Sequence, residues 1–252
     1  MYPTIFGFID SYVLMIILGV VAAFIVLLIY FIKRQLTRNE VIDILVCGVA
    51  AVFFGIVFAC LFENLYEFVQ DPSNYKWTWG LTFYGGLFGG VLGFLLIYFL
   101  YYKKHHFGVM KDLLIIAPAS ITVAHAIGRI GCFLDGCCYG KPTDSWIGVQ
   151  FPNLSEKVIP TQLIESIFLF LLFAIIMVLI YVFKFKYTFP TYMISYAIFR
   201  FIIEFYRGDN RGAFLGIFSP SQIWCMFLFI GGIGFIFIEH YLIFKDGKSK
   251  EE

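Results

Sequence analysis

Long apolar runs separated by short polar segments make up most of this chain. A membrane-spanning helix needs about 20 mostly apolar residues, and seven runs approach that length. We expect helices over residues 12–32, 41–62, 80–102, 113–130, 160–183, 191–206 and 221–244. The pattern therefore predicts an all-α integral membrane protein with about seven transmembrane helices. Residues 1–252 form a single polytopic membrane domain in this interpretation, because no break in composition divides the chain.

Composition supports a membrane protein. The chain is 61% hydrophobic and 14% charged, whereas soluble domains are roughly 45–50% apolar and about 25% charged. With a net charge of +1 and no basic patch interleaved with aromatic residues, nucleic acid is not expected as a partner. The first apolar run lacks a basic segment before it, and Asp10 precedes a run long enough to span. We therefore expect a retained helix there and not a cleaved signal peptide.

Basic residues predict the orientation of these helices. They follow the first, third, fifth and seventh predicted helices: Lys33, Arg34, Arg38, Lys103, Lys104, Lys111, Lys184, Lys186, Lys245, Lys248 and Lys250. By the positive-inside rule these helix ends are cytoplasmic. The N-terminus is then outside, the C-terminus is cytoplasmic, and the other connections face outward.

The most reactive stretch runs from residue 125 to 144, where the fourth predicted helix ends. His125, Arg129 and Cys132 share one helical face by their spacing, and a glycine-rich segment follows Arg129. Ionisable groups at bilayer depth are costly, so they usually face a protein-lined cavity or an anionic ligand. His125 is open to a second interpretation as a hydrogen-bonded structural residue, but Arg129 favours a ligand site.

Three thiols in this stretch, at Cys132, Cys137 and Cys138, allow three interpretations. A zinc site usually needs four ligands with closer pairing, so no metal or other cofactor is expected. A disulfide is possible on the outer face, where thiols oxidise. A reactive thiol would need a lowered pKa, which a nearby arginine helps to supply. The other cysteines lie in apolar runs and are expected to be buried as small hydrophobic residues: Cys47, Cys60 and Cys225.

The sixth predicted helix is unusually polar. Tyr196, Arg200, Glu204 and Arg207 follow the spacing i, i+4, i+8 and i+11, which places them on one helical face. Glu204 can pair with either arginine, so an internal ion pair is one interpretation. The second is an anion site, because Arg129 adds a further cation and guanidinium groups match phosphate oxygens. We expect this group to bind the phosphate of a phospholipid.

Glycines begin the third predicted helix. Tyr84 precedes Gly85 and Gly86, and two more glycines follow at residues 89 and 90. Small residues in membrane helices permit close helix packing. The alternative is a backbone surface that contacts substrate, with the Tyr84 hydroxyl as a donor.

The order of these motifs resembles that of the bacterial prolipoprotein diacylglyceryl transferases. The resemblance covers most of the chain and rests on the following residues: Tyr84-Gly-Gly-Leu87, Gly128-Arg-x-Gly-x-Phe133, Gly140, Pro160-x-Gln162-x-x-Glu165, Tyr196-x-x-x-Arg200-Phe-x-x-Glu204-Phe-x-Arg207 and Ser219-x-x-Gln222.

The resemblance implies an enzyme of the bacterial plasma (inner) membrane with its active site toward the outer face. Members of the family transfer the diacylglyceryl group of phosphatidylglycerol to the lipobox cysteine thiol in the signal peptide of a prolipoprotein. A thioether forms and glycerol phosphate leaves. By resemblance, Arg129 and Arg200 match the essential arginines, Tyr196 matches a functional tyrosine, and Gly85 and Gly140 match glycines that shape the site.

Several positions depart from the family pattern. The family usually has histidine at Tyr84, asparagine at Cys132 and Asp135, and glutamate at Cys137. A tyrosine with a pKa near ~10 is a poor base at neutral pH, so another group has to assist: Asp135, His125 or Glu204. The thiol acceptor could equally supply its own reactivity.

We therefore expect two groups of site residues. The catalytic ones are Arg129, Arg200, Tyr196, Tyr84 and Asp135. Those that contact substrate are Gly85, Gly86, Cys132, Cys137, Gly140, Glu204 and Arg207. Two other functions stay open from the residues alone, namely a related phospholipid-dependent transferase with a different acceptor, or a non-enzymatic lipid-binding or redox membrane protein.

Overall fold

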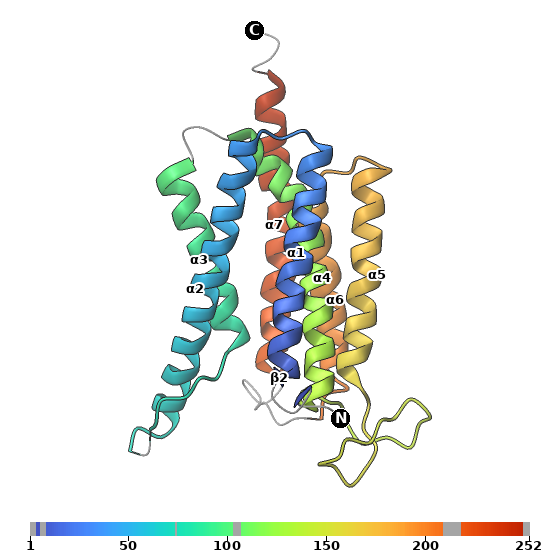
Figure 1. Cartoon of the computed structure of the whole chain (residues 1–252). Coiled ribbons are helices and arrows are strands. Elements are labelled where there is room, and N and C mark those ends of the chain that lie inside the picture. Colours follow the sequence, from blue (N-terminus) through green and yellow to red (C-terminus); the bar gives the residue numbers. More distant parts are fainter. Residues whose placement is uncertain (1–3, 6–8, 74, 103–106, 209–217, 249–252) are drawn as a thin grey trace. The chain divides into compact units, whose positions relative to one another are not determined.

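The computed structural model describes residues 4–5, 9–73, 75–102, 107–208 and 218–248 (Figure 1). The described chain forms seven α-helices: α1 (Ser11–Lys33), α2 (Arg38–Gln70), α3 (Phe83–Ile97), α4 (Phe107–Asp135), α5 (Thr161–Tyr181), α6 (Thr188–Glu204) and α7 (Pro220–Lys248). A π-helical turn, η1 (Tyr98–Tyr102), extends α3, and two short strands, β1 (Thr4–Ile5) and β2 (Ile9–Asp10), pair antiparallel near the N-terminus. The predicted number of helices is confirmed within these residues.

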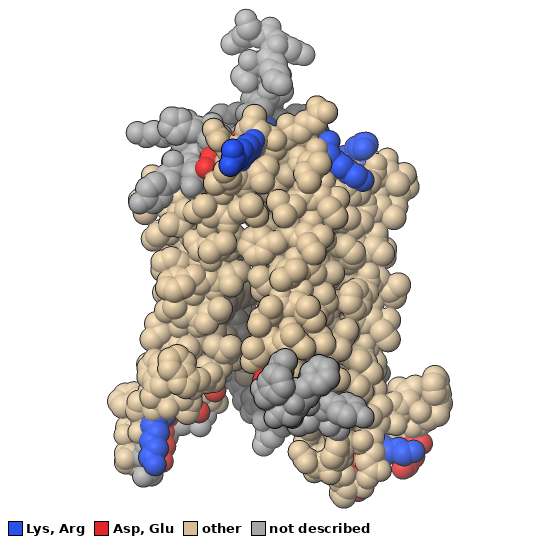
Figure 2. Space-filling view, viewed as in Figure 1, with Lys and Arg blue, Asp and Glu red and all other residues tan. Residues whose placement is uncertain are grey.

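Length and composition identify a helical membrane protein. Five helices, α1, α2, α4, α5 and α7, are long and apolar enough to cross a membrane, whereas α3 and α6 have 15 and 17 residues. On the face shown in Figure 2, the charged side chains lie near the helix ends. Some basic residues used to predict the orientation lie outside the described residues: Lys103, Lys104 and Lys250.

Several predicted helix ends are wrong. α2 continues to Gln70 and not to residue 62, and α4 begins at Phe107 and not at residue 113, and continues to Asp135 and not to residue 130. The predicted ends followed apolarity, but helical hydrogen bonds continue through polar residues as readily as through apolar ones. Arg129 consequently lies six residues before the last residue of α4, inside the helix and not at its exit.

The chain divides into two compact units, residues 31–110 and residues 1–30 with 111–252. The single domain expected from the sequence stays a prediction. In the first of these units α2 and α3 lie side by side (Figure 1). A Cβ atom at Gly85, Gly89 or Gly93 would lie within 3 Å of Phe58 or Phe54 on α2. These glycines allow the two helices to pack closely, which confirms the packing interpretation.

In the other unit, a proline inside α4 is linked to the start of α6. Pro118 has no N–H group, so the carbonyl of Leu114 loses its usual helical donor. The hydroxyl of Thr188 lies 3.4 Å from that carbonyl oxygen and 2.7 Å from the oxygen of Ile115. In an apolar interior such a side-chain donor replaces the missing backbone bond. α6 is thereby anchored to the middle of α4.

The segment between α4 and α5 joins the ends of three helices. Gly140 donates its N–H to the carbonyl of Ile159 at 2.8 Å, and Lys141 donates to the carbonyl of Tyr206, just after α6, at 2.8 Å. Gly140 also forms an isolated β-bridge with Arg207. A Cβ atom at Gly140 would lie 2.7 Å from the Tyr206 oxygen. Glycine is therefore required where these two segments meet.

We predict that Thr188→Val lowers the free energy of unfolding by about 1–2 kcal/mol, because a buried carbonyl then lacks a donor. Thr191→Val is the matched control, since its hydroxyl bonds only within α6, to Tyr187 at 2.7 Å. The Thr191→Val variant should lower the free energy of unfolding by about 0.6 kcal/mol or less, which is the average contribution of a hydrogen bond measured in a membrane protein. Reversible unfolding in mixed micelles measures both values, and equal losses would contradict the assigned anchor.

Candidate active site

α4 and α6 end, and α5 begins, at the same end of the unit (Figure 1), and charged side chains gather there. Glu165 on α5 is fully buried, and Arg200, Glu204 and Arg207 are less than 9% exposed. Arg129 reaches the same group from α4. Burying an ion in an apolar interior costs several kcal/mol unless it is paired. The pairing of these groups is therefore the main constraint on the site.

Glu165 is the centre of the first group. Its Oε1 atom lies 3.0 Å from Arg129 Nη2 and accepts a 2.9 Å hydrogen bond from the Tyr196 hydroxyl. His125 Nε2 lies 3.7 Å from the same oxygen, and the His125 ring meets Tyr196 edge-on with centroids 5.0 Å apart. One carboxylate thus joins α4, α5 and α6. The predicted proximity of His125, Arg129 and Tyr196 is explained by this contact.

Glu165 was missing from the predicted site residues, although its motif contributed to the resemblance. A signal was available, because a carboxylate within an otherwise apolar membrane helix is a functional candidate by default. The sequence shows the carboxylate but not its partners, which lie 31 to 40 residues away along the chain. Its central place is evident only from its tertiary contacts with Arg129 on α4 and Tyr196 on α6.

The second ion pair joins Arg200 and Glu204 on α6. Arg200 Nη1 lies 2.7 Å from Glu204 Oε2, which identifies Arg200 as the partner among the two that the spacing allowed. The hydroxyl of Ser219 donates a 2.8 Å hydrogen bond to Glu204 Oε1. Ser219 and Gln222 also cap the start of α7, since the Gln222 N–H donates to Ser219 Oγ and the Ser219 N–H donates to Gln222 Oε1. α7 is thereby tied to the buried pair.

Arg207 corrects one prediction. It was expected on the helical face of Arg200 and Glu204, but α6 ends at Glu204 and Arg207 lies beyond the following turn. The chain leaves the helix there because the carbonyl of Tyr206 accepts a hydrogen bond from the Lys141 N–H. Arg207 is buried through its bridge to Gly140, so tertiary pairing and not helical spacing brings it to the site.

The site is rich in guanidinium groups. Arg200 and Arg207 are buried, the Arg129 side chain is 14% exposed, and Arg129 and Arg200 pair with the buried carboxylates of Glu165 and Glu204. Nε of Arg129 is buried and has no hydrogen-bond partner among the described residues. A guanidinium with a free donor suits an anionic ligand such as a phosphate. The arrangement can therefore bind an anion and stabilise added negative charge.

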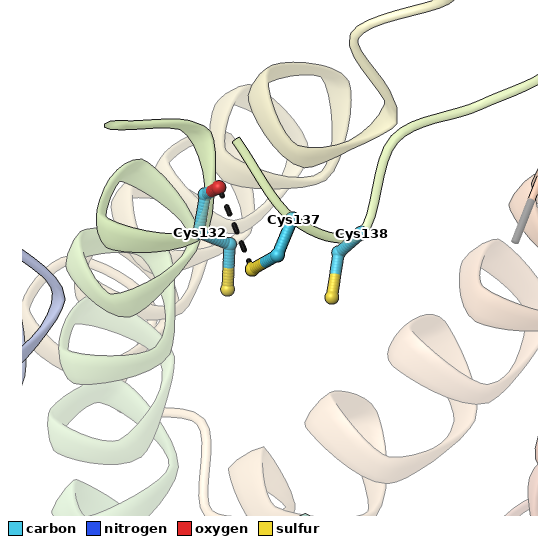
Figure 3. A group of neighbouring side chains, drawn as sticks. All are labelled: Cys132, Cys137 and Cys138. Atoms are coloured by element: carbon cyan, nitrogen blue, oxygen red, sulfur yellow. Dashed lines mark hydrogen bonds between the residues drawn. The ribbon is translucent and has the colours of Figure 1, made fainter. Parts of the chain in front are cut away.

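Three cysteines lie together beside this group. The Sγ atoms of Cys132, Cys137 and Cys138 are all within 4.8 Å of one another, and Figure 3 shows them on the same side of the connecting turn. All six cysteines are free thiols, so the disulfide alternative is not realised in this structure. The predicted burial of the remaining three is confirmed: Cys47, Cys60 and Cys225.

The backbone at the cysteines is fixed by α5 and by the turn itself. Gln162 Nε2 donates to the Cys137 carbonyl at 2.5 Å, and the Thr161 hydroxyl donates to the Cys138 carbonyl at 2.9 Å. Gly136 and Cys138 both have positive φ, 80° and 65°. A positive φ is unusual for a side-chain-bearing residue and shows that tertiary contacts determine this turn.

The environment separates the two neighbouring thiols chemically. Hydrogen bonds from the Cys132 and Cys137 thiols, together with the Arg207 guanidinium, hold the pKa of Cys138 below its usual range. Hydrogen bonding to Cys132 and Cys138, with burial, raises the pKa of Cys137. Cys138 is thus the thiol most readily present as a thiolate.

The remaining predicted residues are Asp135 and three residues at the start of α3. Asp135 is the last residue of α4, and its side chain is exposed. Tyr84, Gly85 and Gly86 belong to the α2–α3 unit, and the side chain of Tyr84 lies outside the described part of the chain. Their place in a substrate site stays a prediction.

Comparison with known proteins gives a consistent result. The family described as "Prolipoprotein diacylglyceryl transferase" matches residues 4–238. A phosphatidylglycerol–prolipoprotein diacylglyceryl transferase of Clostridium tetani is 36% identical over 234 residues, covering 90% of this chain and 91% of the relative. Phosphatidylglycerol–prolipoprotein diacylglyceryl transferase 2 of Clostridium perfringens is 35% identical, covering 91% of each chain. The enzyme of that name from Geobacter sulfurreducens is 32% identical, covering 88% and 87%.

We predict that Glu165→Gln destabilises the fold by about 3 kcal/mol, because Arg129 would be buried without its anion. Glu156→Gln, at an exposed position, is the matched control and should change stability by less than about 0.5 kcal/mol. The double variant Arg129→Gln/Glu165→Gln should lose less than the sum of the two single losses. Additive losses in a double-mutant unfolding cycle would show that the pair does not interact.

Proposed function

The chain belongs to the prolipoprotein diacylglyceryl transferase family, and we propose that it transfers the diacylglyceryl group of phosphatidylglycerol to a cysteine thiol of prolipoproteins. In this reaction a glyceryl C–O bond to the phosphate breaks, a C–S bond forms, and glycerol phosphate leaves. The observation that carries the proposal is the open donor at Arg129 Nε, in a group where Arg129 and Arg200 are both oriented by buried carboxylates.

The arginines supply the electrostatic part of the reaction. When the C–O bond breaks, its electron pair remains on the phosphate, which gains negative charge. Arg129 and Arg200 hold this phosphate, since donors fixed in a region without water stabilise developing charge most strongly. Glu165 and Glu204 orient the two guanidinium groups through contacts of 3.0 and 2.7 Å. Tyr196 completes the first contact by donating to Glu165.

The remaining predicted residues have narrower roles in the proposal. Gly140 keeps the connecting segment close to Arg207, which adds a third cation. Cys132 and Cys137 line the side of the site where the acceptor thiol enters. Asp135, the last residue of α4, is exposed at the edge of the site and assists proton transfer there in the proposal. Tyr84, Gly85 and Gly86 contact the lipid substrate in the proposal.

We place the protein in the bacterial inner membrane, with all seven helices crossing it, the N-terminus outside and the C-terminus in the cytoplasm. The distribution of lysines and arginines supports this orientation. Five helices have the necessary length and apolarity, and α3 with η1 and α6 complete the set. The buried group then lies near the outer surface, where secreted precursors carry their lipobox cysteine.

We predict that Arg129→Lys and Arg200→Lys each lower kcat/KM by about 100-fold or more, because a lysine loses the forked donors that match phosphate. Arg38→Ala, at an exposed position at the start of α2, is the control and should keep the full rate. Purified protein in phosphatidylglycerol vesicles receives a lipobox peptide, and the release of glycerol phosphate is measured.

Each result has a definite meaning. Release that needs the peptide and falls only in the two lysine variants supports the transferase and its phosphate clamp. Peptide-dependent release that persists in both variants removes the clamp from the mechanism. Wild-type protein that releases no glycerol phosphate would contradict the proposed reaction and favour a different acceptor or a lipid-binding role.

The orientation gives a separate prediction. Green fluorescent protein fused after Glu252 should fluoresce, because it folds in the cytoplasm. Alkaline phosphatase fused after Lys157, between α4 and α5, should be active, because it folds only outside. The reversed pair of signals would overturn the outward-facing site.

A further inference from the structure

The three-thiol group is not used by the phosphate clamp. Cys132 comes from the last turns of α4, whereas Cys137 and Cys138 come from the turn that follows (Figure 3). Their sulfur atoms all lie within 4.8 Å of one another. Thiols buried only as small hydrophobic residues have no reason to converge. The sequence spacing had argued against a metal, but spacing along the chain does not report this convergence.

The separation of the sulfur atoms fits a metal ion. Zinc–sulfur bonds are about 2.3 Å long, so sulfur atoms around one tetrahedral zinc lie roughly 3.8 Å apart. The sulfur–sulfur distances in this structure would have to shorten by about 1 Å or less to reach that value. Small rotations of the cysteine side chains are sufficient for this change. A disulfide instead requires a sulfur–sulfur distance near 2.05 Å and uses only two of the three thiols. The three-fold convergence therefore favours a metal over a disulfide.

The backbone of the group is already fixed. Side chains of α5 hold the carbonyl groups of Cys137 and Cys138 at 2.5 and 2.9 Å. The Cys137 N–H donates to the Cys132 carbonyl at 3.1 Å, which holds the turn against the end of α4. Metal sites depend on such supporting hydrogen bonds to orient their ligands. The ligands consequently need no large rearrangement to bind an ion.

Charge also fits. Three thiolates and one Zn²⁺ carry a net charge of −1, which requires a cation nearby. Arg207 forms a hydrogen bond with Cys138, and Arg129 interacts electrostatically with Cys132 and Cys138. Among the described residues, the group contains no histidine or carboxylate as a fourth ligand. Zinc sites with three protein ligands and one open position are typically catalytic and not structural.

We propose that Cys132, Cys137 and Cys138 bind a zinc ion whose fourth position takes the acceptor thiol of the prolipoprotein. This inference rests on the proposed transferase function, because that reaction needs a thiolate as nucleophile. Coordination to zinc deprotonates a thiol outright. The ion would thus supply the deprotonation that the reaction requires.

The step balances. The acceptor thiol replaces a water molecule on zinc and releases its proton to water. The sulfur electron pair then attacks the glyceryl carbon, the C–O bond breaks, and glycerol phosphate leaves with that electron pair held by the arginines. The thioether product is a neutral, weaker ligand than a thiolate, so water replaces it on zinc. No oxidant or reductant is needed.

Metal binding is tested first, without activity. The full chain is purified in detergent under a reducing agent, its zinc is measured by elemental analysis, and Co²⁺ is then substituted for zinc. We expect one ion per chain, cobalt–thiolate charge-transfer absorption, and loss of both in Cys132→Ser, Cys137→Ser and Cys138→Ser. Cys47→Ser, on α2, is the matched control and should keep both. The site would be overturned if cobalt bound without thiolate absorption, or if cobalt binding were unchanged in the three serine variants. It would also be overturned if the cysteines formed a disulfide and the protein bound no metal.

The lipobox peptide tests the fourth position. When the lipobox peptide is added to the cobalt-substituted chain, the charge-transfer absorption should increase by the amount expected for one further cobalt–thiolate bond. A peptide with serine in place of the lipobox cysteine should leave the absorption unchanged. An identical response to both peptides would overturn the proposed ligation. This measurement does not depend on turnover.

Activity separates the inference from the transferase proposal. At pH 7 a free cysteine is about 3% thiolate, so removing zinc should lower peptide-dependent glycerol phosphate release by about 30-fold, with recovery when zinc is returned. The residual rate should rise about tenfold per pH unit below the thiol pKa, whereas the zinc-loaded rate should not. Full activity after metal removal would overturn the zinc role and leave the transferase standing. A zinc site with the expected peptide response but no glycerol phosphate release would instead contradict the transferase.

Discussion

Burial of an arginine against a single carboxylate determines how the larger unit is built. Arg129 lies inside α4 with only 14% of its side chain exposed, and the carboxylate that it meets is 1% exposed. Breaking such a buried pair by removing one partner costs about 3–5 kcal/mol, which is a large fraction of the stability of an ordinary domain. Glu165 therefore fixes the rotation of α5 against α4. Because Tyr196 donates to the same carboxylate, α6 is fixed by the same contact.

The second ion pair extends this arrangement to α7. Glu204 accepts from Ser219 while pairing with Arg200, and Ser219 also caps α7. A polar residue that satisfies both a helix end and a buried charge explains why α7 begins where it does. The polar groups that give the site its chemistry are thus also those that align the helices. In an apolar bilayer, where helices gain little from burying more apolar surface against each other, polar contacts and close packing provide this alignment.

The segment after α4 connects the arginine group with the three thiols. Gly140 pairs with the chain after α6 and brings in Arg207, while the turn two residues earlier holds Cys138 against α5. A displacement of this segment would move a cation and a thiol together. The candidate site therefore consists of two parts, the arginines and the three sulfur atoms, and this short segment contributes to both.

The local pattern of apolar and polar residues determined much of the secondary structure of this protein. The apolar runs predicted all seven helices, because helices in an apolar solvent must present apolar side chains over a fixed length. The i, i+4 spacing of Arg200 and Glu204 allowed their ion pair, and the glycines of α3 indicated close packing. Helix ends were less accurate, because hydrogen bonds continued through the polar residues that close α2 and α4.

Only the tertiary structure decided which distant groups meet. Glu165 lies far along the chain from both Arg129 and Tyr196, so no periodicity could identify it as their common partner. Arg207 reaches the site through a bridge to Gly140, whereas its spacing indicated a helical face. The convergence of Cys132, Cys137 and Cys138 depends on a turn with positive φ at Gly136 and Cys138 and on two hydrogen bonds from α5. The sequence by itself determined the helices and the chemical groups on them, because both follow from local spacing and from the apolar solvent. Which of these groups pair with each other was decided only by the tertiary structure, because packing sets the contacts between distant residues.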